Sequence, residues 1–202
     1  MVKSKTSIGI GTALTIAGSD SGGGAGIQAD LKSFSAHGVY GASVVTAVTA
    51  QNTRAVTMVE AVSPALIRAQ IAAVLDDIRI DAIKIGMLGG ADVIRAVVDG
   101  LTGYAGPIVV DPVMVAKSGD ALLPDEAVAS LIDHLLPRAS LLTPNIPEAA
   151  RLLGGKVTAD PVQQAEKLLA MGPEAVLMKG GHAEGPVCKD LLVSGGDNIW
   201  LI

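Results

Sequence analysis

The sequence predicts an α/β fold with a mainly parallel central sheet flanked by helices on both faces. Short apolar runs rich in β-branched residues alternate with amphipathic helical segments along the chain, which is the pattern of right-handed βαβ units. Half of the 202 residues are hydrophobic, but only one Trp, two Tyr and one Phe occur. Ala, Val, Ile and Leu must therefore build the core, as they do in parallel sheets covered on both faces. No internal repeat or linker interrupts the pattern, so we expect one domain over residues 1–202.

The first half of the chain is predicted to alternate strands with three helices. A helix over 25–37 is expected to end at Gly38, because glycine readily adopts the left-handed conformation of a helix cap. Pro64 is expected to open the next helix, in which apolar residues recur at helical spacing as far as Ile78. The strands of this half are expected at 13–17, 43–50, 57–62 and 82–85, and the third helix runs through Val93, Ile94 and Val97.

The second half continues the alternation and closes with a hairpin. A buried strand over 107–111 stops at the carboxylate of Asp111, and a short strand over 175–178 stops at Lys179. Glycines between the last apolar runs predict a closing hairpin. The remaining elements are expected as helices at 125–136, 148–153 and 161–170, a strand at 141–142, and hairpin strands at 191–193 and 199–202 around a turn at 195–197.

Composition excludes several classes of protein. The formal charge is −5, and no basic run or aromatic–basic interleaving occurs, which argues against a nucleic-acid partner. The single cysteine, Cys188, excludes an intrachain disulfide framework and favours a reducing compartment. No stretch reaches the ~18 unbroken apolar residues that a membrane helix needs, and no apolar run follows the first lysines as in a signal peptide. We therefore expect a cytoplasmic protein without a membrane partner.

A glycine-rich segment, 18–30, lies between the first strand and the first helix. Its sequence is Gly-Ser-Asp-Ser-Gly-Gly-Gly-Ala-Gly-Ile-Gln-Ala-Asp. Glycines at this place let backbone N–H groups approach a ligand, and a helix N-terminus attracts anions. The spacing matches neither the dinucleotide fingerprint nor the phosphate loop that ends in Gly-Lys-Ser/Thr. A tight strand-to-helix turn without a ligand explains the glycines equally well.

Polar residues follow several strands, where ligands bind in open α/β sheets. Asp111 precedes a proline and suits Mg²⁺, although an aspartate that caps a turn is the more common case. Asn145 and Glu148 suit a metal–phosphate centre, and their spacing also forms a helix capping box. Lys179 precedes two glycines and suits a transferring phosphate, although a lone loop lysine is usually solvated.

Taken together and in order, six motifs resemble the hydroxymethylpyrimidine/phosphomethylpyrimidine kinases of thiamine biosynthesis, members of the ribokinase-like superfamily. The resemblance covers residues 13–202. The motifs are the glycine-rich segment at 18–30, Val-Thr-Ala-Gln-Asn-Thr at 48–53, Ile-Lys-Ile-Gly-Met-Leu at 83–88, Val-Asp-Pro-Val-Met-Val-Ala-Lys-Ser-Gly at 110–119, Leu-Thr-Pro-Asn-Ile-Pro-Glu-Ala at 142–149 and Leu-Met-Lys-Gly-Gly-His at 177–182.

The resemblance implies an activity and a set of site residues. That family uses ATP and Mg²⁺ to phosphorylate 4-amino-5-hydroxymethyl-2-methylpyrimidine and then its monophosphate, and its members are dimers. By resemblance, Gln51 hydrogen-bonds the pyrimidine, which suits an amide that offers both a donor and an acceptor. The other implied residues are Gly18, Asp30, Met87 and Val113 for the substrate, Asn145, Lys179, Gly180 and Gly181 for the ATP phosphates, and Asp111 and Glu148 for the metal.

The sequence departs from the family pattern at its end. Family members carry a later Gly-Thr-Gly-Cys loop that supplies an anion hole and a catalytic base, but no Gly-Thr-Gly occurs in these 202 residues. We therefore assign no catalytic base, and expect a fold that lacks its last C-terminal elements and exposes apolar sheet surface. The alternatives to the pyrimidine kinase are a pyridoxal kinase and a non-catalytic binding relic of the kinase. A dinucleotide-dependent oxidoreductase has the wrong glycine spacing.

Overall fold

The computed structural model describes residues 9–114, 123–155, 160–180 and 189–201. Within these ranges the chain forms an eight-stranded sheet in the order β10-β9-β8-β7-β6-β5-β1-β2 and a separate two-stranded sheet, β3-β4. The neighbours from β8 to β2 are parallel, whereas β9 is antiparallel to both β8 and β10. The strands of the large sheet are β1 (Thr12–Ala17), β2 (Tyr40–Val45), β5 (Ala82–Ile85), β6 (Ile108–Val110), β7 (Leu141–Leu142), β8 (Ala175–Met178), β9 (Asp190–Ser194) and β10 (Asp197–Leu201).

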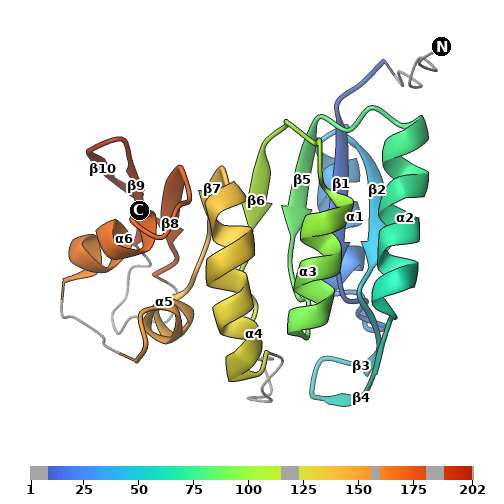
Figure 1. Cartoon of the computed structure of the whole chain (residues 1–202), viewed down its shortest axis with the longest axis horizontal. Coiled ribbons are helices and arrows are strands. Elements are labelled where there is room, and N and C mark those ends of the chain that lie inside the picture. Colours follow the sequence, from blue (N-terminus) through green and yellow to red (C-terminus); the bar gives the residue numbers. More distant parts are fainter. Residues whose placement is uncertain (1–8, 115–122, 156–159, 181–188, 202) are drawn as a thin grey trace.

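The predicted strand 43–50 is wrong as a single strand. The chain leaves the large sheet at Thr46, and β3 (Ala47–Gln51) pairs instead with β4 (Val56–Ala61) in a projecting hairpin (Figure 1). Thr46 fixes the bend, because its N–H donates to Ala17 O at 3.0 Å and its hydroxyl donates to Met87 O at 2.7 Å. The apolar run does not mark this bend, since both strands on either side of Thr46 are apolar.

Helices cover both faces of the sheet, as predicted. Figure 1 shows α2, α3 and α4 in a row in front of the sheet, with α1 behind β1 and β2. The helices are α1 (Gly26–Ala36), α2 (Pro64–Asp77), α3 (Ala91–Gly100), α4 (Asp125–Ser130), α5 (Ile146–Leu152) and α6 (Pro161–Leu169). Among the residues that the structure describes, no helix combines the length and apolar character needed to cross a membrane.

The predicted helix 125–136 begins where expected but does not stay α-helical. After α4 the chain forms a π-helical turn over Leu131–Leu135 and a 3₁₀ turn over Leu136–Arg138. Pro137 explains the change, because proline has no N–H to donate and its ring clashes with the carbonyl group four residues earlier. The closing hairpin is confirmed, and Gly195 and Gly196 form its turn with φ angles of 58° and 93°.

The two faces of the sheet are buried to different degrees. Every residue of β1 is buried, whereas β5 and β8 alternate fully buried with half-buried residues. The helix α1 contains no fully buried residue, and all of β10 is exposed. The strand β10 therefore exposes apolar surface: Ile199, Trp200 and Leu201 are 50%, 47% and 47% exposed.

Candidate active site

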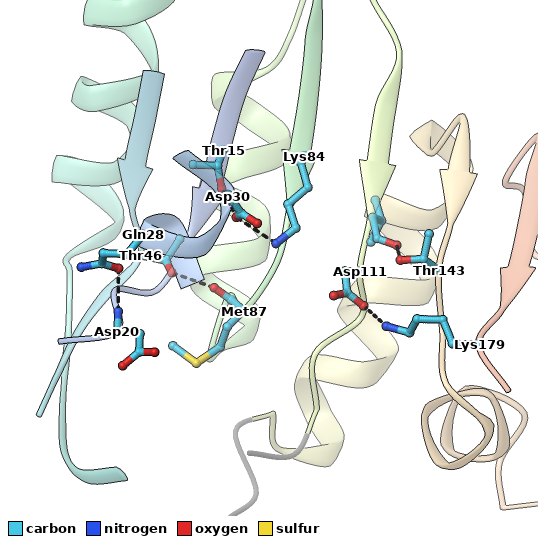
Figure 2. A network of polar contacts seen from close by, with 11 residues as sticks. Thr15, Asp20, Gln28, Asp30, Thr46, Lys84, Met87, Asp111, Thr143 and Lys179 are labelled. Atoms are coloured by element: carbon cyan, nitrogen blue, oxygen red, sulfur yellow. Dashed lines mark hydrogen bonds and ion pairs between the residues drawn. The ribbon is translucent and has the colours of Figure 1, made fainter. Parts of the chain in front are cut away.

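The parallel strands bring most of the predicted site residues to one edge of the sheet. The strands β1, β5, β6 and β8 end at Ala17, Ile85, Val110 and Met178, and the candidate residues follow these ends directly. Figure 2 shows two groups of polar side chains there, one around Asp30 and Met87 and one around Asp111 and Lys179. The two groups differ in chemistry.

The glycine-rich loop is organised by Asp20, which is 5% exposed. Its Oδ1 accepts from the N–H of Gly22 at 2.8 Å, and its Oδ2 accepts from the N–H groups of Gly24 and Ala25 at 2.9 and 2.8 Å. Asp20 N in turn donates to Gln28 Oε1 at 2.8 Å. Three backbone donors of the loop are therefore bound to the protein's own carboxylate. This hydrogen bonding is compatible with a loop that binds a ligand and with a tight strand-to-helix turn that binds none.

Gly18 and Gly26 hold the loop close to its surroundings. A side chain at Gly18 would overlap the end of Met87, and a side chain at Gly26 would overlap the carbonyl oxygen of Gly18. Gly26 also has φ +55°, a conformation that favours glycine. The structure therefore brings Gly18 and Met87 into direct contact.

Gln51 lies at the end of β3, beside the same loop. Its N–H donates to Ser21 Oγ at 2.8 Å, and the Ser21 hydroxyl donates to Gln51 O at 2.8 Å. The side-chain oxygen of Gln51 is 3.4 Å from Thr49 Oγ1. Within the described ranges, the side-chain NH₂ group of Gln51 donates to no protein atom, so it is available to a ligand.

Asp30 lies on α1, and its side chain is bound by residues of β1 and β5 in the sheet. Thr15 Oγ1 donates to Asp30 Oδ2 at 2.6 Å, and Lys84 Nζ lies 2.9 Å from the same oxygen (Figure 2). The side chains of Lys84 and Asp30 are 24% and 17% exposed. The remaining polar group, Asp30 Oδ1, has no hydrogen-bond partner among the described residues.

The second group contains one lysine and two carboxylates. Lys179 Nζ lies 2.7 Å from Asp111 Oδ1 and 4.0 Å from Glu148 Oε2. The capping box predicted for Asn145 and Glu148 is confirmed: Glu148 N donates to Asn145 Oδ1 at 2.9 Å, and Asn145 N donates to Glu148 Oε2 at 2.8 Å. Asn145 also bridges Lys179 through the backbone, so the helix N-terminus and the lysine lie side by side.

Glu148 is 7% exposed, and loss of water around a carboxyl group destabilises its ionised form. Burial raises the pKa of its carboxyl group, and the nearby charge of Asp111 raises it further. The Asn145 N–H bond and the charge of Lys179 lower the pKa and partly offset that rise. A further cation beside Glu148 would therefore stabilise the ionised form of its carboxyl group.

The other predicted residues are placed less favourably or lie elsewhere. Gly180 N–H already donates to Asp190 Oδ1 at 2.8 Å, and any side chain at Gly180 would overlap the backbone of Lys189. Gly181 lies outside the described residues. Val113 borders a small, mostly apolar cleft together with Gly86, so it stands near the end of β5.

No sequence signal marked Thr15, and Asp20 and Lys84 were marked only as polar residues at strand ends, without a specific role; all three organise the site. Lys84 gave the clearest signal, because it stands between two isoleucines of a buried strand. A charged side chain in such a strand has to be paired. The loop aspartate Asp20 could be found from the glycines around it, whose N–H groups need acceptors.

Comparison with known proteins gives the class of the protein as a kinase with a ribokinase-like fold. The sequence profile described as phosphomethylpyrimidine kinase matches residues 20–202, and the chain belongs to this family. The hydroxymethylpyrimidine/phosphomethylpyrimidine kinase of Rhizobium meliloti is 56% identical over 186 residues, which are 91% of this chain and 70% of that protein. The resemblance stated from the motifs is therefore confirmed.

Two solved structures extend the comparison. The phosphomethylpyrimidine kinase from Clostridium difficile has 48% sequence identity and a TM-score of 0.85, over 94% of this chain and 83% of that one. An ADP complex of Bacillus subtilis pyridoxal kinase has 36% identity and a TM-score of 0.86, over 95% of this chain and 74% of that one. The predicted fold class is thus confirmed, and pyridoxal kinases are more distant relatives in sequence.

Proposed function

We propose that this chain binds 4-amino-5-hydroxymethyl-2-methylpyrimidine and its monophosphate and transfers a phosphate group to each from ATP. The observation that carries the proposal is the juxtaposition of two groups at one sheet edge. One group offers amide, carboxylate and thioether side chains to a small ring. The other offers a lysine and two carboxylates to a metal-bound triphosphate. The Rhizobium meliloti relative is named as a kinase of this same substrate and of its monophosphate.

The substrate would lie over the ends of β1 and β5. Gln51 offers an unused amide donor, and Asp30 offers an unused carboxylate oxygen. Met87 and Val113 supply apolar contact, and the absence of a side chain at Gly18 leaves room for Met87. A ring with hydrogen-bonding edges and apolar faces matches these groups.

Mg²⁺ would be held by Asp111 and Glu148. The residues fit this ion, because Mg²⁺ takes one or two carboxylates and keeps several waters. Asp111 Oδ2 accepts no hydrogen bond from the described residues, and Glu148 is a buried carboxylate with a raised pKa. When bound, the ion would neutralise charge on the transferring phosphate.

The protein's own groups contribute position and charge to the transfer. In the first transfer the substrate's alcohol oxygen attacks the γ-phosphorus and loses its proton, and in the second transfer a phosphate oxygen of the monophosphate attacks. In each transfer the bond from the γ-phosphorus to the ADP oxygen breaks. Lys179 would act as a point charge on the transferring group, and Asn145 would contact the phosphates at the N-terminus of α5. We assign no catalytic base within these residues.

The proposal includes the setting of the enzyme. Residues 1–202 form a single kinase domain that acts in the cytoplasm as a homodimer. Its composition supports this setting, with one cysteine and a formal charge of −5. Symmetric dimers are the commonest oligomers of soluble proteins. Light scattering of the purified chain tests the dimer directly.

The test is to incubate the chain with ATP, Mg²⁺ and the pyrimidine alcohol, and to follow ADP together with the mass of the product. We expect a product heavier by one phosphate group, then by a second, with one ADP formed for each. Calorimetry measures binding separately from transfer. Binding without transfer would support a non-catalytic relic, and absence of binding would overturn the proposal.

Pyridoxal is the matched competitor, because the Bacillus subtilis structure belongs to a pyridoxal kinase. We expect the pyrimidine alcohol to bind at least about tenfold more tightly than pyridoxal, a difference of ~1.4 kcal/mol. A clear preference for pyridoxal in both binding and turnover would replace the proposed substrate.

A further inference from the structure

We propose that Thr15 and Lys84 are positioning residues that hold one oxygen of Asp30 and leave its other oxygen as a dedicated acceptor for an N–H donor of the substrate. The proposal rests on the proposed function and assigns the recognition of the pyrimidine's amino group to this trio. It predicts selectivity for aminopyrimidines over ring analogues without that donor.

The hydrogen bonds distinguish the two oxygens of Asp30. Thr15 Oγ1 at 2.6 Å and Lys84 Nζ at 2.9 Å both contact Oδ2. Among the described residues, no donor reaches Oδ1. An ionised carboxylate only accepts hydrogen bonds, and the Asp30 side chain is 17% exposed, so a ligand can reach it. The free oxygen therefore suits a ligand that donates.

The two donors are held rigidly. Thr15 and Lys84 are paired in register on the neighbouring strands β1 and β5, and Thr15 is 0% exposed. The carboxylate of Asp30, on α1, lies between the side chains of Thr15 and Lys84 (Figure 2). The carboxylate is thus fixed between the sheet and the helix, so its orientation does not depend on the substrate.

The trio lies close to the strand ends that carry the candidate substrate residues. Gly86 follows Lys84 by two residues on the same side of the strand, and a side chain there would come within 2.9 Å of Lys84 Nζ and 3.2 Å of Ala17 Cβ. Ala17 precedes Gly18, which contacts Met87. The ammonium group therefore reaches the level at which β1 and β5 end.

The opposite end of β1 offers a matched control. There Thr12 donates through its N–H and its hydroxyl to Asp81 Oδ2 at 3.0 and 3.1 Å, and Arg79 pairs with Asp81 Oδ1 at 2.8 Å. This second trio has the same composition, a threonine, an aspartate and a cation. It lies at the amino end of the strand, away from the candidate site, so its loss affects folding alone.

The experiment measures binding of the pyrimidine alcohol and of its analogue without the 4-amino group, by calorimetry on the 202-residue chain. In the native chain we expect the amino compound to bind about 10- to 100-fold more tightly. In Lys84→Met and Thr15→Val we expect that ratio to fall by about tenfold, with little change in binding of the analogue. Thr12→Val and Arg79→Met should keep the native ratio.

The outcomes separate this inference from the proposed function. If the native chain binds neither compound, the proposed function fails first. If the native chain prefers the amino compound but Thr15→Val and Lys84→Met keep its full preference, the inference is overturned. If these variants weaken both compounds equally, the trio is structural only, which also overturns it. Thr15→Val preserves shape and strand preference, so it keeps the test valid if Lys84→Met does not fold.

Discussion

Two lysine–aspartate pairs lie at the same edge of the sheet, with similar separations and different neighbours. Lys84 is 2.9 Å from Asp30, and Lys179 is 2.7 Å from Asp111. The third group beside the first pair is the neutral hydroxyl of Thr15, whereas the third group beside the second pair is the carboxylate of Glu148. The first pair is therefore balanced in charge, and the second carries an excess negative charge.

This difference in neighbours gives the two lysine–aspartate pairs different functions. A balanced, half-buried pair orients its carboxylate and has no electrostatic reason to accept a cation. A lysine between two carboxylates has such a reason, and the buried carboxylate of Glu148 gains from any additional positive charge. We therefore assign the pair that is balanced in charge to the substrate, and the group with excess negative charge to the metal and phosphates. Each prediction below tests this assignment.

The largest effect is expected from Asp111→Asn. Loss of this carboxylate removes the excess negative charge beside Lys179, so the Mg²⁺-dependent part of ATP binding should fall by about 100-fold or more. Calorimetry with and without Mg²⁺ measures it. Asp30→Asn is the matched control, because it should weaken pyrimidine binding but keep the Mg²⁺ dependence. An Asp111→Asn chain with native Mg²⁺ dependence would contradict the charge argument.

The balanced pair should be the more sensitive to crowding. Gly86→Ala would place a methyl group 2.9 Å from Lys84 Nζ and 3.2 Å from Ala17 Cβ. We expect it to lower the free energy of unfolding by ~1–3 kcal/mol and to weaken pyrimidine binding about tenfold. Gly11→Ala is the control, since its methyl group would meet only Val39 Cγ2 at 3.9 Å. Equal denaturation midpoints for Gly86→Ala and Gly11→Ala would show that a methyl group at position 86 does not crowd the Lys84–Asp30 pair.

The sequence predicted the order of elements well and the site only in part. The strands 82–85, 141–142 and 175–178 match the structure, because short apolar runs between glycines and polar residues have clear limits. The bend at Thr46 was not predictable, since it depends on hydrogen bonds to Ala17 and Met87, which are distant in sequence. Distant partners of this kind leave no periodic signal.

The same limit explains what was missed in the site. The capping box of Asn145 and Glu148 was predictable, because both of its hydrogen bonds join residues three apart. The bond from Lys84 to Asp30 joins residues 54 apart, and it follows only from the folded sheet. Local chemistry can therefore be read from the sequence, whereas the pairing of charges requires the structure.

A smaller effect is expected from Asn145→Ala on the metal–phosphate side. The substitution removes the acceptor for Glu148 N–H, so the free energy of unfolding should fall by ~1 kcal/mol. Chemical denaturation measures this change. Ser63→Ala is the control at the start of α2, where the cap bond is longer, 3.3 Å to Leu66 N. ATP binding should weaken in Asn145→Ala and stay native in Ser63→Ala; the reverse would separate the cap from the phosphate site.

The smallest effect concerns the pH dependence of Glu148→Gln without metal or nucleotide. Burial raises the pKa of Glu148 in the folded state, so the protonated form is favoured there and ionisation costs stability as pH rises through that pKa. Glutamine has no such cost and keeps an oxygen for the Asn145 N–H. The Tm of Glu148→Gln relative to the native chain should therefore increase from pH 4 to pH 7. Added Mg²⁺ should reverse the order at neutral pH, because it stabilises only the native carboxylate. If the Tm difference between Glu148→Gln and the native chain stayed constant with pH, Lys179 would already compensate the charge of Glu148. The argument from excess negative charge would then be wrong.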